Sequence, residues 1–208
     1  MIDRLAYLIK SHLPGIFPVI VYFGQWVTVL QFSRRRAEAL AAASIQGEVA
    51  GQRAVIRPLG LDDLDALQVF LKAIPESHLK YFHPHEFGQA YLTAVLRSRS
   101  FMTYGLFIED ALAAYPLLKL APTGSAFMGL LVGPEHTGKG IGRFIVEYLY
   151  WQASLVGLRT RSTISSRNLA SLRSHRAVSD FKVVADLPND YMMVEFPRVR
   201  REKPVLRL

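Results

Sequence analysis

Three glycines at alternate positions, Gly138, Gly140 and Gly142, constrain what this chain can form more than any other feature. They follow the apolar run 126–132 and precede a stretch whose apolar residues have helical spacing. Glycine has no side chain to keep a backbone away from a bound group, and it readily adopts positive φ. Because the first N–H groups of a helix lack partners within the helix, a loop of this kind at a helix start predicts a pyrophosphate site.

Spacing separates the kinds of phosphate-binding loop. A Walker loop requires Ser or Thr after its Gly-Lys pair, and here Lys139 is followed by Gly140. The dinucleotide loop has the spacing G-x-G-x-x-G and follows the first strand of its domain, whereas this loop lies in the second half of the chain. Both remain minor alternatives.

The segment from Val132 through Pro134 and Thr137 to Gly142 resembles motif A of the GNAT superfamily of N-acetyltransferases. The core pattern of that motif is Q/R-x-x-G-x-G/A after a V-x-P strand end, and Thr137 stands here in place of Gln or Arg. The resemblance implies acetyl-CoA as acyl donor, held by the strand end and the loop. The residues so implied are Leu130, Leu131, Val132, Thr137, Gly138, Lys139, Gly140, Ile141, Gly142 and Arg143.

A second part of the resemblance begins at Asn168. In GNAT enzymes an Asn at the end of the last core strand contacts the pantetheine arm, and a residue seven positions later protonates the departing thiolate. His175 occupies that later position, and imidazole, with an ordinary pKa of about 6.5, is partly protonated at neutral pH. Asn168 is also a good helix N-cap and a lone His is commonly a packed residue, so both structural roles stay open.

A general base is harder to assign, because the run 126–132 contains no carboxylate. Glu135, Glu86 and His85 are candidates that would act through water. The last two belong to the cluster Phe82-His83-Pro84-His85-Glu86-Phe87, which also fits a structural loop or a surface that contacts the acceptor. Zinc would need a fourth ligand that the cluster does not offer, so we expect no metal.

Composition sets the class of protein and the partners. With 208 residues, 50% of them hydrophobic, the chain can form one domain with a sizeable core and an extension. The absence of cysteine from the sequence excludes disulfides and a thiolate nucleophile and is consistent with a cytoplasmic location. The formal net charge of +8 indicates anionic partners, although part of it lies in the basic tail 198–208. Without a stripe of interleaved basic and aromatic residues, we expect coenzyme A rather than nucleic acid.

Residues 51–197 are expected to form the main domain. Strands are predicted over 53–57, 103–108, 112–118, 126–132, 159–165, 182–185 and 192–196, and helices from 61, over 89–97, after the glycine loop and over 168–178. This order resembles that of the GNAT family. We therefore expect an α/β (α+β) fold, with a mixed, mostly antiparallel central sheet and helices on both faces.

Residues 1–50 are expected to be an extension, with an amphipathic helix over 2–13 and a hairpin of strands 19–23 and 26–32. The Gly24-Gln25 pair would form the two-residue turn. A hairpin is marginal alone, so we expect it to pack on the domain or on a second copy in a homodimer, burying Trp26. Breakers and polar residues argue against a membrane span over 13–32: Pro14, Gly15, Pro18, Gly24, Gln25, Thr28 and Gln31.

The resemblance implies that the chain is an acyl-CoA-dependent N-acyltransferase. It would transfer acetyl from acetyl-CoA to the amine of a small molecule, such as an amino sugar or a metabolite, by direct attack. The alternative is a noncatalytic GNAT-like module that binds a ligand or a partner.

Overall fold

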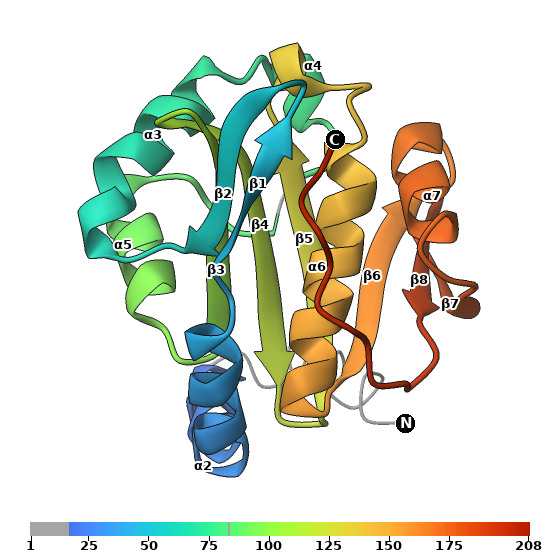
Figure 1. Ribbon diagram of the computed structural model, residues 1–208. Helices are drawn as coiled ribbons and strands as arrows, with labels where there is room; N and C mark the ends of the chain where they lie inside the picture. The colour runs from blue at the N-terminus through green and yellow to red at the C-terminus, as the bar shows by residue number, and fades with distance from the viewer. Residues whose placement is uncertain (1–16, 83) are drawn as a thin grey trace.

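The computed structural model describes residues 17–82 and 84–208 and contains an eight-stranded sheet (Figure 1). The helix expected over 2–13, the side chain of Trp26 and His83 lie outside the described parts. The helices and strands are α2 (Phe17–Ala41), β1 (Ile45–Val49), β2 (Gln52–Pro58), α3 (Leu64–Ala73), α4 (Glu76–Leu79), α5 (Gln89–Arg97), β3 (Phe101–Ile108), β4 (Ala111–Ala121), β5 (Ser125–Val132), α6 (Ile141–Val156), β6 (Arg159–Ser165), α7 (Leu169–Arg176), β7 (Lys182–Leu187) and β8 (Tyr191–Glu195), with short 3-10 turns η1 (Leu61–Asp63) and η2 (Pro134–His136).

The strands lie in the order β1-β2-β3-β4-β5-β6-β8-β7. Every neighbouring pair is antiparallel except β5 and β6, which run parallel because α6 carries the chain back between them. The predicted mixed, mostly antiparallel sheet is therefore confirmed. The parallel pair matters most for function, because a crossover places the loop before α6 at the carboxyl end of β5, where open sheets bind ligands.

Helices pack on both faces of the sheet (Figure 1), and a hydrophobic core lies on each face. The first core lies beneath α2 and α6 and contains Phe32 and the fully buried Leu149. The second lies beneath α3 and α5, around Leu67 and Leu92. Side chains of successive residues in a strand point to opposite faces, so each central strand serves both cores. In β4, for example, Leu118 belongs to the first core and Leu117 to the second.

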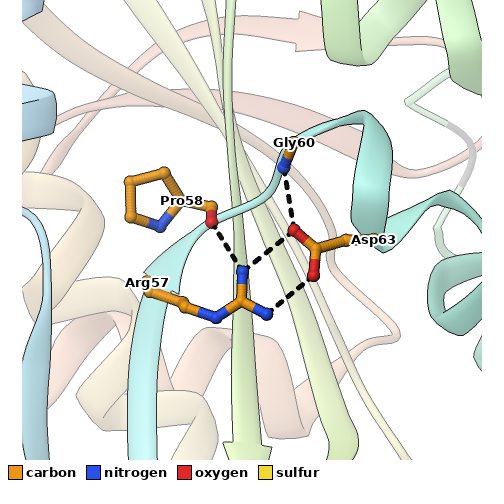
Figure 2. Close-up of polar contacts among 4 residues, drawn as sticks. All are labelled: Arg57, Pro58, Gly60 and Asp63. Carbon is orange, nitrogen blue, oxygen red and sulfur yellow. Dashed lines mark hydrogen bonds and ion pairs between the residues drawn. The ribbon is translucent and has the colours of Figure 1, made fainter.

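An ion pair joins the end of β2 to the start of α3 (Figure 2). Arg57 donates to the two carboxylate oxygens of Asp63 at 2.9 and 2.6 Å and to the Pro58 carbonyl at 3.1 Å. The Gly60 N–H donates to the same carboxylate at 2.9 Å, and the guanidinium lies 4.3 Å from the centroid of the Phe107 ring. The hydrogen bonds from Arg57 lower the pKa of Asp63 below its usual value. The pair fixes where α3 begins over the second core.

The hairpin expected over 19–32 is wrong, because the chain forms the single helix α2 there. Pro18 is the second residue of this helix, in the first turn, where its missing N–H costs nothing. Gly24 lies inside the helix, at a cost of about 1 kcal/mol relative to alanine. Burial of Phe32, Ala39 and Ala43 against the rest of the first core offsets this cost. No helix in the described part of the chain is long and apolar enough to cross a membrane.

Phe32 provides a test of whether α2 is part of the folded unit. Its side chain is 6% exposed, whereas that of Leu30 on the same helix is 74% exposed. We expect Phe32→Ala to lower the free energy of unfolding by about 3 kcal/mol, because a buried aromatic ring is lost and a cavity remains. Leu30→Ala should change it by less than about 0.5 kcal/mol. Chemical denaturation of the two variants measures both values, and equal small effects would show that α2 does not belong to the core.

The end of the segment predicted to be a basic tail pairs with β1 through an isolated parallel bridge between Arg207 and Glu48. The N–H groups of Glu48 and Ala50 donate to the carbonyls of Leu206 and Leu208 at 3.0 and 2.7 Å, and the Leu208 N–H donates to Glu48 at 3.0 Å. Leu206 is 1% exposed. Gly47 permits this approach, since a Cβ there would lie 1.8 Å from the Leu206 carbonyl oxygen. Strand β1, which sequence reasoning missed, precedes the boundary expected at residue 50 yet belongs to the same sheet.

Cationic side chains of the same segment pack on α6. The Arg201 guanidinium lies 5.0 Å from the centroid of the Tyr150 ring, and the Lys203 ammonium lies 5.7 Å from that of Trp151. Cations are attracted to the faces of aromatic rings, and their long apolar stems can cover apolar surface. These residues therefore hold the segment in place as well as contributing charge.

Candidate active site

A cleft of about 950 Å³ opens beside the carboxyl end of β5. Its walls come from residues 77–82 and Pro84, from β4, from most of β5, from the glycine loop, from the end of β6 and from α7. The topology explains why these parts meet. Strand β5 leads directly into the loop, α6 carries the chain to the parallel neighbour β6, and α7 follows the end of β6.

The floor of the cleft is a gap between β5 and β6. The two strands pair only over 125–128 and 159–162, whereas β4 pairs with β5 as far as Val132. The Gly133 N–H donates to β4, and backbone groups of successive residues in a strand point to opposite sides. Because the Gly133 N–H points towards β4, the backbone N–H and C=O groups of Val132 and Leu130 point the other way, into the gap. The Leu130 N–H has no ladder partner among the described strands and can donate to a bound carbonyl.

The glycine loop forms the end of the cleft nearest α6. Gly138 and Gly140 have φ of +77° and +80°, and Gly140 is the N-cap of α6. A Cβ on Gly142 would lie 3.2 Å from the Ser174 hydroxyl, so the third glycine allows α7 to approach α6. Arg143 follows in the first turn and lines the cleft. The unpaired N–H groups of a helix start, next to a cation, form a site for an anion.

Most of the residues expected to hold the cofactor line this cleft. They are Leu130, Leu131, Val132, Thr137, Gly138, Gly140, Gly142, Arg143 and Asn168. Lys139 is exposed and Ile141 is buried in the first core, and neither side chain is part of the lining. The Thr137 hydroxyl donates to the Pro134 carbonyl at 2.8 Å, so it closes η2 rather than pointing its proton at a ligand.

Asn168 has the N-cap role, and its place in the cleft leaves the predicted cofactor contact open. Its Oδ1 accepts the Ser171 N–H at 3.1 Å, which makes it the N-cap of α7. The residue also lines the cleft. Capping uses only the carbonyl oxygen, so the side-chain NH₂ group remains available to a ligand.

His175 lies in the cleft wall with both ring nitrogens hydrogen-bonded. Nδ1 lies 2.8 Å from the Ser171 carbonyl, which can only accept, so Nδ1 carries the proton. The Ser162 hydroxyl then donates to Nε2 at 3.1 Å. The residue is 1% exposed, and burial lowers its pKa from 6.5 to about 4. At neutral pH the ring is therefore uncharged. The proton-donor role implied by the resemblance stays a prediction, and it would require protonation of a ring whose burial disfavours the charged form.

His85 and Glu86, two of the expected bases, do not line the cleft. His85 stacks on Tyr91 with centroids 5.7 Å apart, its Nε2 lies 3.0 Å from the Tyr115 hydroxyl, and its Nδ1–H donates to the Glu86 carbonyl at 2.7 Å. Burial lowers the pKa of this imidazole. Glu86 is exposed. These contacts match the interpretation of the segment as a structural loop.

Two histidines that sequence reasoning missed do line the cleft. His78 donates Nε2–H to the Val132 carbonyl at 2.8 Å and so satisfies one backbone group at the open side of β5. His136 has Nε2 at 3.3 Å from the carboxylate of Glu135, and its buried Nδ1 has no partner among the described residues. Glu135, the third expected base, is mostly exposed and does not line the cleft. His136 directly precedes the loop, whereas no sequence signal marks His78, which comes from α4.

Solved N-acetyltransferase structures superpose on most of this chain. The GNAT domain of S. lividans PAT matches with a TM-score of 0.66 at 16% identity, over 75% of this chain and 97% of that one. The chain has the GNAT fold.

Two further structures share the GNAT fold and were solved with the coenzyme. PaiA N-acetyltransferase from Thermoplasma acidophilum, in complex with coenzyme A, gives a TM-score of 0.58 at 19% identity, over 69% of this chain and 98% of that one. Mycobacterium smegmatis RimJ, in complex with CoA-disulfide, gives 0.58 at 17% identity, over 74% and 86%. No family model and no curated protein matches the sequence. At these identities the likeness concerns the GNAT fold.

Proposed function

We propose that this protein is an acyl-CoA-dependent N-acyltransferase that transfers acetyl from acetyl-CoA to the amine of a small molecule by direct attack. The observation that carries the proposal is the gap between β5 and β6 inside a cleft that also contains the glycine loop. One continuous cleft thereby offers a helix start for the pyrophosphate and a free strand N–H for the thioester carbonyl.

The cofactor is proposed to lie across the gap. N–H groups from Gly138 to Arg143 would hold the pyrophosphate, and the guanidinium groups of Arg143 and Arg173 would add positive charge. The free amide of Asn168 would contact the pantetheine arm. The Leu130 N–H, which has no ladder partner among the described strands, would donate to the thioester oxygen as negative charge develops on it.

The reaction forms one N–C bond and breaks one C–S bond. The lone pair of a neutral amine attacks the thioester carbon, the tetrahedral intermediate expels the thiolate, and one proton from the nitrogen ends on the sulfur. Because His175 is uncharged at neutral pH, we assign this proton to the attacking amine. Alignment of amine and thioester then supplies most of the rate.

Titration calorimetry with coenzyme A, followed by thiol release from acetyl-CoA over a panel of amines, tests the proposal. We expect one CoA to bind per chain, with a dissociation constant between ~1 μM and ~1 mM, and thiol release that requires an amine. Mass spectrometry should show one acetyl group on the product. CoA binding without transfer to any amine would identify a noncatalytic binding module, and absence of CoA binding would overturn the proposal.

A further inference from the structure

The side chains that line the cleft have one sign of charge. None of the described lining residues is Asp or Glu, whereas Lys119, Arg143 and Arg173 all line it. The nearest acidic side chain in sequence to the loop, Glu135, lies outside the lining and beside His136. A cleft with one sign of charge concentrates ligands of the opposite sign. The phosphates of the proposed cofactor would pair with Arg143 and Arg173, which leaves Lys119 without an anionic partner.

Lys119 lies in a different part of the cleft from the two arginines. Arg143 and Arg173 belong to α6 and α7, around the glycine loop. Lys119 belongs to β4 and pairs across the sheet with Phe127, near the start of β5, whereas the loop follows its end. Cross-strand partners project on the same face, so Lys119 and Phe127 flank one arm of the cleft. The Lys119 ammonium lies 5.9 Å from the centroid of the Phe101 ring, and no ion pair among the described residues involves it.

The rest of that arm is apolar and aromatic. Leu117 and Gly129 are the next cross-strand pair on the same face, and a Cβ on Gly129 would lie 3.3 Å from Leu117 and 3.5 Å from Phe82. Phe82 therefore covers this face, and Tyr81 and Pro84 from the same segment also line the cleft. An ammonium group would find no carboxylate among the described side chains of this arm. A ligand with an apolar body and a negative group would find partners for both.

We infer that the acceptor is an amine that carries an anionic group, a carboxylate or a phosphate, on an apolar or aromatic body, with Lys119 binding the anion. This inference rests on the proposed acyltransferase function and names the substrate class of that site. It also accounts for the lack of a carboxylate base. Positive charge around the cleft lowers the pKa of a bound ammonium and so favours the neutral amine that attacks the thioester.

The test compares amines that share an apolar body and differ in whether they carry a negative group. L-Phenylalanine is paired with L-phenylalaninamide, and tyramine O-phosphate with tyramine, so the two pairs distinguish a carboxylate from a phosphate. kcat/KM for acetyl transfer is measured with the wild-type chain, Lys119→Met, Lys119→Arg and Lys72→Met.

In the Lys119→Met variant, methionine keeps the unbranched apolar stem of lysine without the charge. Lys72 is an exposed lysine on α3 outside the cleft and serves as the matched control. Titration of each amine into CoA-saturated protein measures the same preference without turnover.

In at least one pair we expect kcat/KM for the anionic member to exceed that for the other member by 10-fold or more, mainly through a lower KM. A hydrogen bond to a charged group contributes enough free energy for a ratio of this size. The preference should fall below about 3-fold in Lys119→Met and persist in Lys119→Arg and Lys72→Met. Equal use or binding of the two members of both pairs, or a preference that survives in Lys119→Met, would overturn the inference. If the wild-type chain neither binds CoA nor transfers acetyl to any amine, the acyltransferase function is refuted, and the inference falls with it.

Discussion

Replacement of Gly140 by valine should weaken coenzyme A binding by at least ~10²-fold while the protein remains folded. Gly140 has φ of +80° at the N-cap of α6, a conformation that a β-branched residue adopts only with strain. The new side chain would also start 3.3 Å from a methyl group of Leu208. Either the loop shifts or the valine occupies its surface, and both outcomes separate the N–H groups from the pyrophosphate. Loss of one or two charge-assisted hydrogen bonds is enough for the expected change.

Gly51→Val is a matched control for backbone strain. Gly51 has φ of +76° in the turn between β1 and β2, a Cβ there would meet no neighbouring atom within 4 Å, and the residue takes no part in the cleft. Both variants should lose similar stability in chemical denaturation, and only Gly140→Val should lose CoA affinity in calorimetry. Wild-type affinity in a folded Gly140→Val protein would remove the loop from the cofactor site.

Acidification should destabilise the protein through His175. The ring has a pKa of about 4 in the folded chain and 6.5 in the unfolded one, so the unfolded state takes up the proton first as the pH falls. The contribution of the neutral ring is fully present above pH ~6.5 and is lost as the pH falls towards ~4. Between pH 8 and pH 5 we expect a loss of about 2 kcal/mol in the free energy of unfolding from this group. Denaturant titrations at both pH values measure it.

His175→Gln separates this effect from catalysis. Glutamine can keep hydrogen bonds at the site but does not titrate, so the variant should lose about 2 kcal/mol less than the wild type over the same pH range. An identical pH dependence in the variant would show that the folded ring is not held neutral. A fall in kcat of about 10²-fold at unchanged stability would instead assign His175 as the proton donor.

The part of the site that could be predicted from sequence is local. The glycine loop and the helix after it are contiguous, and their glycine spacing and helical periodicity are visible in one window of the chain. Gly157, with φ of +80°, ends α6 as expected, and β6 occupies the predicted 159–165. Asn168 and His175 are fixed relative to each other by two helical turns, so their joint appearance in one wall of the cleft also followed from spacing.

What could not be predicted depends on contacts between distant segments. His78 reaches the Val132 carbonyl from α4, and nothing near either residue in sequence indicates that contact. Lys119 faces the cleft because of the register between β4 and β5. The pKa of His175 depends on burial, which is a property of the folded chain. For α2, local signals were misleading because the breakers Pro18 and Gly24 are tolerated within a long helix whose later turns pack on the first core.

The pairing of residues 206–208 with β1 gives the sheet two unequal borders. Backbone groups of Glu48 and Ala50 are occupied, so this border is not open to strand addition by another molecule. At the other border, β7 exposes Val183 and Val184, but its register with β8 is interrupted between Val183 and Ala185. An irregular strand is a poor template for intermolecular β-pairing. Aggregation by edge-to-edge association is therefore disfavoured at both ends of the sheet, by a covering segment at one and by a bulge at the other.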